Sequence, residues 1–137
     1  MSADSAYPLM HRPPTSDSAL LTPLELAHRI AALCGEKKAT DVTILDMRGV
    51  CDYTDFFVLA TGANARQTKA VADEVHGVLK QESRVTPLSQ SGLPEARWIV
   101  ADYLDVVLHV FDPETRAFYR LEDLWSDVPK VAVAAGA

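Results

Sequence analysis

The feature that most constrains the fold is a run of six almost entirely apolar residues in the middle of the chain, residues 56–61. A strand with one face in water alternates apolar and polar side chains, whereas a run without that alternation suits a strand covered on both faces. Such a strand lies inside a sheet against which helices pack. The run therefore predicts the central strand of an α/β domain.

Helix signals on both sides of this run supply two elements that would cover the sheet. Thr22 and Glu25 have the spacing of a capping box, and Pro23 suits the first position of a helix. A second helix is expected from Asn64, a preferred N-cap residue, and its apolar positions recur at helical spacing as far as Leu79. Each helix therefore has one apolar side that can pack against a sheet.

The remaining elements are predicted from apolar runs and breakers. Further strands are expected at residues 42–47, 85–89, 98–103 and 106–111. The last two form a hairpin, and Pro87 places the weak strand before them at an edge, because proline cannot donate to a ladder. Asp112 begins a third helix that runs to about residue 120, with Phe118 and Leu121 facing inward. The order α-β-β-α-β-β-β-α predicts an α/β fold with a single mixed sheet flanked by helices.

The two ends of the chain differ from its middle. Residues 1–20 are rich in Pro and Ser and contain no apolar block, so we expect a disordered extension rather than a targeting peptide. Residues 132–137 are expected to form a flexible tail, which leaves residues 21–131 as one domain. No stretch approaches the apolar length of a membrane span, and Cys34 and Cys51 are too few for a disulfide scaffold, so a cytoplasmic protein is expected.

The charge of the chain is unevenly distributed. The net charge of −6 argues against a general nucleic-acid coat protein, which needs a basic face. Seven acids and two bases lie between residues 98 and 127, together with the aromatic residues Trp98, Tyr103, Phe111, Tyr119 and Trp125. An acidic surface with aromatic anchors suits docking to a basic protein, and we expect no direct nucleic-acid specificity. The alternative is an ordinary solubilising surface whose aromatic residues belong to the core.

Two weaker signals point toward chemistry. Residues 61–64 join a strand to a helix, and such a helix N-terminus could hold an anion, although one glycine is not a phosphate loop and an Asn cap explains the segment equally well. Asp55, Asp102 and Asp105 could hold a divalent metal, but turn-capping explains them too, and residues 85–89 supply no further acid. The four histidines have no ligand spacing. We therefore expect no metal, no cofactor and no catalytic group.

Three ordered segments resemble the ribosomal silencing factor family, RsfS, which is also called Iojap. They are TDFFVLATG at residues 54–62 followed by Arg66 and Gln67, WIVADY with DVVLHVF at residues 98–111, and RAFYRLEDLW at residues 116–125. The resemblance extends from residue 22 to residue 131. Each segment alone is unspecific, whereas the three in this order are specific.

The resemblance implies a nucleotidyltransferase-like fold without an established transferase activity, so the chain is expected not to be an enzyme. It implies binding to the large ribosomal subunit through ribosomal protein L-fourteen, on the face where the small subunit would dock. Occupation of that face would block subunit joining and repress translation, especially under nutrient limitation. Ribosomal proteins are typically basic, which agrees with the acidic surface predicted from the charges.

Matching positions to the family pattern selects eight residues for the contact with the partner. They are Asp55, Arg66, Trp98, Asp102, Tyr103, Asp105, His109 and Trp125. The acids would supply charge complementarity, and the aromatic residues would supply buried anchors. Each has a competing structural role, since Trp98 could belong wholly to the core and the acids beside the hairpin turn could only cap it.

The chain departs from the family pattern at two positions. Ser91 stands before Gly92 where the family usually has Glu, which removes one acid near the edge of the sheet. Leu104 stands in the hairpin turn where the family usually has Gly. A two-residue hairpin turn often requires a positive φ, which a bulky residue resists at a cost of roughly 1 kcal/mol. Either the turn differs in type or the strain is tolerated, so the departures concern the docking surface rather than the fold.

Two functions of other classes stay open. A nucleotidyltransferase or nucleotide-binding domain would agree with the implied fold and with the turn at Gly62. A homodimeric interaction module outside translation would agree with the apolar strands and with a free sheet edge near Val85. Members of the RsfS family are often seen as dimers. Finding a homodimer would therefore not distinguish such a module from a ribosomal silencing factor.

Overall fold

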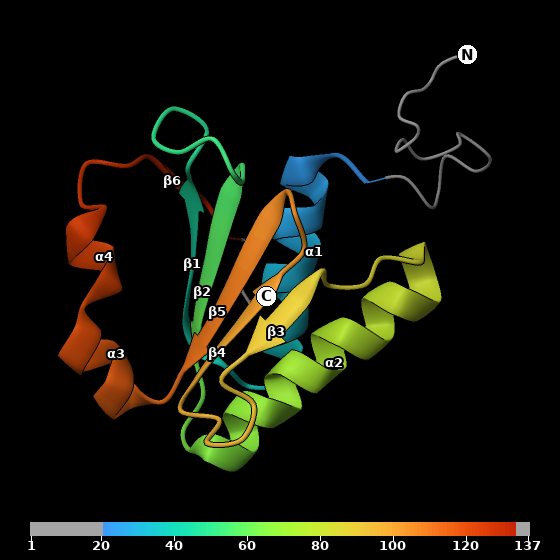
Figure 1. Cartoon of the computed structure of the whole chain (residues 1–137), viewed down its shortest axis with the longest axis vertical. Coiled ribbons are helices and arrows are strands. Elements are labelled where there is room, and N and C mark those ends of the chain that lie inside the picture. Colours follow the sequence, from blue (N-terminus) through green and yellow to red (C-terminus); the bar gives the residue numbers. More distant parts are fainter. Residues whose placement is uncertain (1–20, 134–137) are drawn as a thin grey trace.

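The structure is a computed structural model and describes residues 21–133. The extension predicted for residues 1–20 and the end of the tail, residues 134–137, lie outside the described residues. The predicted α/β fold with one mixed sheet is confirmed (Figure 1).

Six strands form the sheet, in the spatial order β3-β4-β5-β2-β1-β6. Their bounds are β1 (Thr40–Asp46), β2 (Phe56–Thr61), β3 (Ser89–Ser91), β4 (Trp98–Asp102), β5 (Val106–Phe111) and β6 (Lys130–Val131). The central strands β2 and β5 are parallel, and all other neighbours are antiparallel. Every residue of β2 and β5 is buried, which confirms the prediction of a central strand covered on both faces.

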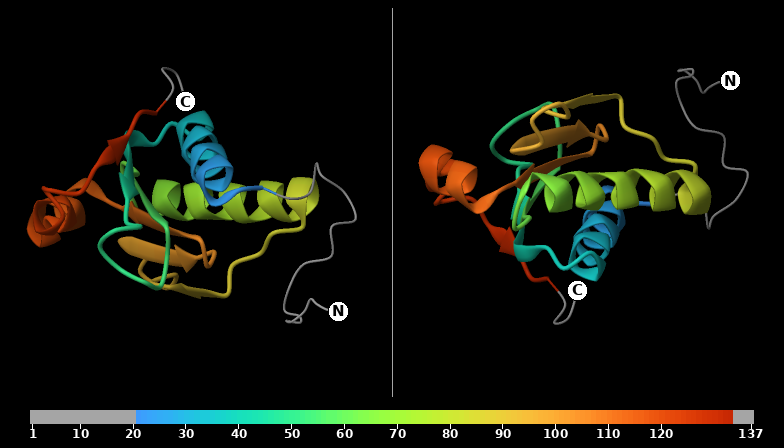
Figure 2. Two further views of the ribbon diagram at one scale, coloured as in Figure 1. Left: turned by 90° about the horizontal axis from the view of Figure 1, so that it is seen from above. Right: turned by 90° about the horizontal axis from the view of Figure 1, so that it is seen from below.

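Helices cover the two faces of the sheet unequally. The long helices α1 (Pro23–Glu36) and α2 (Ala65–Ser83) lie together on one face, and the short helices α3 (Pro113–Tyr119) and α4 (Leu121–Leu124) lie on the other (Figure 2). Both predicted caps are confirmed. The Thr22 hydroxyl accepts from the Glu25 N–H at 3.1 Å, and the Asn64 side chain accepts from the Gln67 N–H at 2.9 Å. These bonds fix where the two long helices begin.

Each face of the sheet has its own apolar core. The larger core lies between the sheet and the long helices and includes Ile30, Leu33, Phe56, Val75 and Leu108. The smaller core lies on the opposite face and is formed by Leu45, Met47, Phe57, Leu59, Val107, Phe111 and Val128. Alternate residues of β2 and β5 enter the two cores in turn, which is why neither strand has the polar positions of a half-exposed strand.

The edge of the sheet differs from its prediction. The strand expected at residues 85–89 is instead β3, which pairs Ser89 with Asp102 and Ser91 with Val100. Pro87 lies before the paired segment, as its missing N–H requires. The prediction was right that this strand lies at an edge and wrong about where it begins and ends.

The C-terminal part also differs from its prediction. Phe118 does not face inward but is 76% exposed, because α3 has only seven residues and buries only Thr115. Arg120 adopts a left-handed φ of 49°, which ends α3 and directs the chain into α4. The strand β6, which the sequence did not predict, then pairs with β1. Within residues 21–133, no helix combines the length and the apolar character needed to cross a membrane.

Candidate partner-binding face

One face of the sheet carries several aromatic and polar side chains, and Trp98, Val100 and Asp102 on it are partly exposed. Side chains alternate along a strand, so this face carries the residues that point away from α1 and α2. We call it the open face, and its members are Phe57 of β2, Trp98, Val100 and Asp102 of β4, and Val107, His109 and Phe111 of β5. The short helices α3 and α4 lie over only part of it (Figure 2).

Trp98 and His109 form a hydrogen-bonded pair on the open face. The Trp98 indole N–H donates to His109 Nδ1 at 3.2 Å. Burial lowers the pKa of His109 to about 4, so the imidazole is neutral at pH 7. Because Nδ1 accepts, the proton of the neutral ring is assigned to Nε2, which has no partner among the described residues. His109 therefore acts as a fixed acceptor that orients the indole ring.

Further rings extend this pair into a continuous aromatic cluster. The Trp98 ring lies 5.2 Å from Phe111 and 4.9 Å from Tyr119, measured between centroids. Phe57 lies 4.8 Å from His109 and contacts Trp125 edge-on at 6.3 Å. The half-buried Trp125 and the exposed Tyr119 thus connect the C-terminal helical segment to the sheet. Large rings held in one orientation are suited to act as anchors at an interface.

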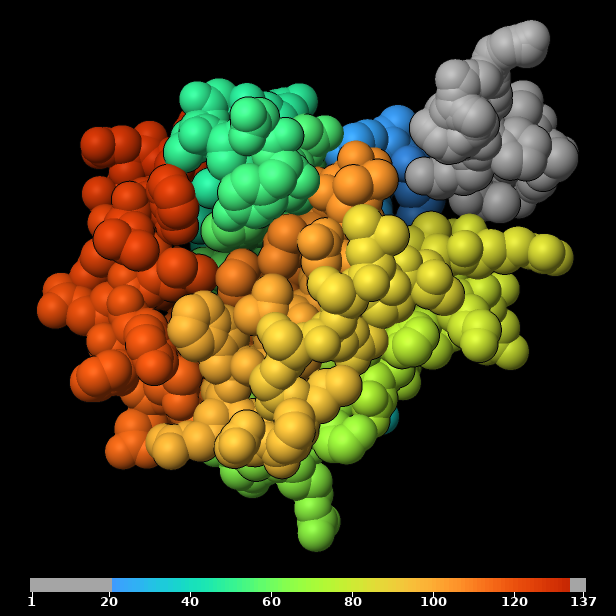
Figure 3. Space-filling model, in the orientation of Figure 1, coloured from blue at the N-terminus to red at the C-terminus, as the bar shows by residue number. Residues whose placement is uncertain are grey.

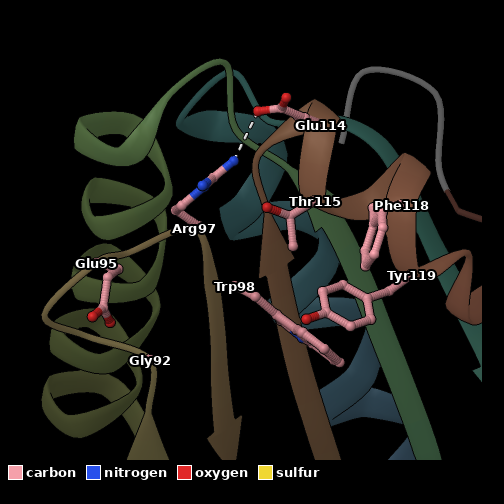
Figure 4. Close-up of a pocket in the computed structure, with 8 residues that line it drawn as sticks. All are labelled: Gly92, Glu95, Arg97, Trp98, Glu114, Thr115, Phe118 and Tyr119. Carbon is pink, nitrogen blue, oxygen red and sulfur yellow. Dashed lines mark hydrogen bonds and ion pairs between the residues drawn. The ribbon is translucent and has the colours of Figure 1, made fainter.

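A hollow of about 420 Å³ adjoins Trp98 at one end of the open face. Its walls are the loop before β4 and the helix α3, and Figure 4 shows the rings of Trp98, Tyr119 and Phe118 gathered on one side of it. Gly92 makes this loop possible, because its φ is 82° and a Cβ there would lie 2.0 Å from the Trp98 carbonyl oxygen. The loop can therefore approach the base of Trp98 only with glycine at this position.

The charges around the hollow are mainly acidic. Arg97 is held by two acids, with its Nε at 3.2 Å from Asp112 Oδ2 and its Nη2 at 2.8 Å from Glu114 Oε1. Burial raises the pKa of Asp112, but hydrogen bonds from Thr115 and Arg97 outweigh this effect and leave the pKa below its usual value. Glu95 is exposed on the opposite wall (Figure 4). The hollow therefore combines aromatic rings with an excess of negative charge.

The predicted acids gather at the other end of the open face. The Leu104 N–H donates to Asp102 Oδ1 at 2.8 Å, so Asp102 caps the turn between β4 and β5. The Asp55 N–H donates to the Asp105 carbonyl oxygen at 3.0 Å, which joins the start of β2 to the same turn. Leu104 adopts the positive φ of 78° that the sequence suggested for this position. All three acids keep part of their surface exposed, so capping leaves their charges near solvent.

The structure separates two predicted residues from this face. Tyr103 is 5% exposed and lies in the larger core, where burial raises the pKa of its phenol and where its hydroxyl has no partner among residues 21–133. Arg66 is exposed in the first turn of α2, and α2 begins near the end of β2, whereas the acids lie near the start of β2 (Figure 1). The structure thus brings Trp98, His109 and Trp125 together, and it places Tyr103 too deep to act as a surface anchor.

Three side chains that shape the face were not among the eight residues selected for the contact, although Tyr119 was noted among the aromatic residues of the acidic segment. Tyr119 and Phe118 wall the hollow, and Arg116 holds α3 and α4 onto the sheet. The Arg116 side chain is 11% exposed, and its guanidinium donates to the Asp41 carbonyl at 2.9 Å, to Thr61 Oγ1 at 2.7 Å and to Glu122 at 2.6 Å. The sequence signals were the place of Tyr119 in the acidic, aromatic segment and its neighbour Phe118. The contacts of Arg116 span 75 and 55 positions and leave no local pattern.

The two weaker sequence signals for chemistry have structural explanations. A Cβ at Gly62 would lie 2.8 Å from the Thr68 backbone nitrogen, so the glycine allows β2 to enter α2 closely. Asp55, Asp102 and Asp105 do not form a metal-binding group, because none of the His, Cys, Asp and Glu residues between 21 and 133 are clustered in a way that could hold an ion. The strand-to-helix turn and the three acids are therefore explained by structural roles.

The fold and this face define a small mixed α/β domain that presents aromatic and acidic side chains on one side of its sheet. The model of the family described as "Ribosomal silencing factor during starvation" matches residues 21–136. The chain is 41% identical over 96 residues to the ribosomal silencing factor RsfS of Halalkalibacterium halodurans, a match that covers 70% of this chain and 81% of that protein. It is 38% identical over 99 residues to RsfS of Bacillus subtilis, which covers 72% and 83%.

Solved structures agree with the sequence relatives. A crystal structure of a protein from Chromobacterium violaceum is similar with a TM-score of 0.74 at 30% identity, and the match covers 85% of this chain and 96% of that one. The chain belongs to the RsfS family, as its three sequence segments suggested.

Proposed function

We propose that this chain is a ribosomal silencing factor that binds the large ribosomal subunit through ribosomal protein L-fourteen. It thereby excludes the small subunit and represses translation in the cytoplasm, especially under nutrient limitation. The mechanism is occupation of volume, so the chain needs no cofactor and acts without catalysis. Membership of the RsfS family is the observation that carries this proposal.

The open face supplies a suitable contact for a basic partner. The hollow beside Trp98 has aromatic rings on one wall and the acids Glu95 and Glu114 at its rim. A lysine or arginine side chain would gain a cation–π contact with Trp98 or Tyr119 and an ion pair at the rim. We therefore expect the hollow to receive a cationic side chain of the ribosomal protein, with Phe118 excluding water around it.

The proposal is tested by sedimentation of the full chain with separated ribosomal subunits. We expect it to sediment with large subunits and not with small ones, and we expect binding to weaken with rising salt because exposed charges are screened. Tyr119→Ala removes a ring of the hollow without opening a core, since Tyr119 is exposed. Affinity for the large subunit should fall about tenfold, as for an aromatic anchor. Absence of the chain from large-subunit fractions at low salt would contradict the proposal.

A further inference from the structure

A second group of exposed side chains lies at the end of the sheet opposite the hollow. The apolar residues Tyr53, Leu88 and Leu104 are exposed there, together with the partly exposed acids Asp55, Asp102 and Asp105, and we call these six residues the tip surface. In Figure 3 the loop before β2 and the turn before β5 lie side by side at this end of the molecule.

Hydrogen bonds hold the tip surface together around Asp102. The Leu88 N–H donates to the Asp102 carbonyl at 2.7 Å, and the Leu104 N–H donates to Asp102 Oδ1 at 2.8 Å. The Tyr53 ring lies 6.4 Å from Phe57, and partial burial, Cys51 and the Asp102 carboxylate raise its pKa. Tyr53 therefore lies close enough to Asp102 for an electrostatic interaction with its carboxylate. Three segments that are distant in the sequence thus present apolar side chains around one carboxylate.

Leu104 is the residue of the tip surface that the fold does not explain. Its φ of 78° is a conformation that glycine adopts freely and that a leucine side chain resists. Its side chain is 54% exposed, so it does not contribute a full share of core packing in return. An apolar side chain in a strained and exposed position is more readily explained by contact with another molecule than by folding.

The charges of the tip surface select among the molecules that could cover it. Arg48, the base on the neighbouring loop, pairs with Asp46 at 2.7 Å and also interacts with Asp55, so this single base offsets only part of the negative charge of the acids in this region. Nucleic-acid phosphates would be repelled. A second copy of the chain would bring the same acids face to face across a two-fold axis. A protein surface that combines a basic residue with an apolar one is complementary both to the acids and to the exposed apolar side chains of the tip surface.

We propose that the tip surface is a second contact for the basic ribosomal protein that binds the hollow, and this inference rests on the proposed function. The strand β4 connects the two contacts, since Trp98 lies at the hollow and Asp102 at the tip. Four residues of a strand span about 13 Å, which is farther than one side chain reaches. Both contacts nevertheless fit within the width of an interface of about 800 Å² per partner. Two separated contacts fix the orientation of the partner on the sheet.

The variant Leu104→Gly tests the tip surface without endangering the fold. Glycine relaxes the backbone at this position, so the midpoint of urea unfolding should stay unchanged or rise. Affinity for purified large subunits should fall about fivefold, as expected for loss of a half-buried leucine contact. Leu24→Ala, which truncates an exposed leucine on α1 behind the sheet, should leave the affinity unchanged. Asp102→Asn keeps an acceptor for the Leu104 N–H and should slow association at low salt.

The outcomes separate the inference from the function on which it rests. If the unmodified chain fails to bind large subunits, both are overturned. If it binds, and Leu104→Gly binds equally well, the tip surface is not a contact and the proposed function stands. A parallel titration uses RNA extracted from the same subunits. If the unmodified chain binds this RNA and Leu104→Gly weakens that binding, the contact is made with RNA and the assignment to a basic protein is wrong.

Discussion

At the scale of single residues, the open face depends on a histidine that is neutral because it is buried. His109 is 7% exposed and holds the Trp98 indole N–H through its Nδ1. The sequence analysis placed His109 among the contact residues, and the structure gives it a positioning role beneath Trp98. Its environment could not be predicted from the sequence, because the rings of Phe57 and Trp98 beside it come from two other strands.

His109 should make the stability of the chain depend on pH. Burial lowers its pKa in the folded state from 6.5 to about 4, so between these values the unfolded state binds the extra proton. The free energy of unfolding should therefore fall as the pH drops, by about 2 kcal/mol between pH 7 and pH 5. Urea unfolding at the two pH values measures this. His109→Gln does not titrate and should lose that part of the dependence, and an equal slope in both proteins would contradict the assignment.

Gly92 should tolerate no side chain. A Cβ would meet the Trp98 carbonyl oxygen at 2.0 Å, and the φ of 82° is unfavourable for alanine. Gly92→Ala should therefore lower the free energy of unfolding by more than the roughly 1 kcal/mol that a left-handed conformation costs alone. Gly77→Ala is the matched control, because Gly77 lies within α2 with open space around it and alanine favours helix by about 1 kcal/mol. Thermal unfolding should shift downward for the first variant and upward for the second.

At the scale of elements, the long helices and the buried strands were predicted more accurately than the short helices and strands. The long helices α1 and α2 and the strands β2, β4 and β5 were predicted because each carries a clear cap, a periodic apolar stripe or an unbroken apolar run. The start and end of α3 were predicted, because Asp112 caps it and it ends at Tyr119, but the inward placement of Phe118 was wrong, and α4 and β6 were not predicted. Helices of seven and four residues have no full apolar stripe, and two-residue strands are defined by their partner rather than by their own sequence.

Arg116 should control how firmly α3 and α4 lie on the sheet. Its nearly buried guanidinium donates to Asp41, Thr61 and Glu122, and charged hydrogen bonds of this kind contribute roughly 1.5–3 kcal/mol each. Arg116→Met should speed amide hydrogen exchange in residues 113–125 while β5 stays protected. It should also weaken binding to large subunits, because Tyr119 loses its fixed position.

The control for this prediction is Arg120→Ala on the same segment. Arg120 pairs with Asp123 at 2.7 Å, but both side chains are well exposed, so the pair should contribute little. Exchange in α3 and α4 should then stay close to that of the unmodified chain. Equal exchange in the Arg116 and Arg120 variants would contradict the role given to Arg116.

At the scale of the whole molecule, charge and shape together suit a protein that acts by occupying a surface. The uneven charge was readable from the sequence, and so was the family, because the three segments retain their order. The division of the open face into an aromatic hollow and an acidic tip was not readable, because β4 carries Trp98 and Asp102 to opposite ends. The burial of Tyr103 was not readable from the sequence either. Tyr103 follows Asp102 in the hairpin, and adjacent residues there face opposite sides of the sheet.

We propose above all that the bound chain keeps the two ribosomal subunits apart. It is tested most directly by mixing separated subunits and following their joining by light scattering, with and without saturating amounts of the full chain. The account predicts that joining is slower and less complete with the chain, and that Tyr119→Ala requires a higher concentration for the same effect. Joining at an unchanged rate and to an unchanged extent, while the chain is bound to the large subunit, would contradict it.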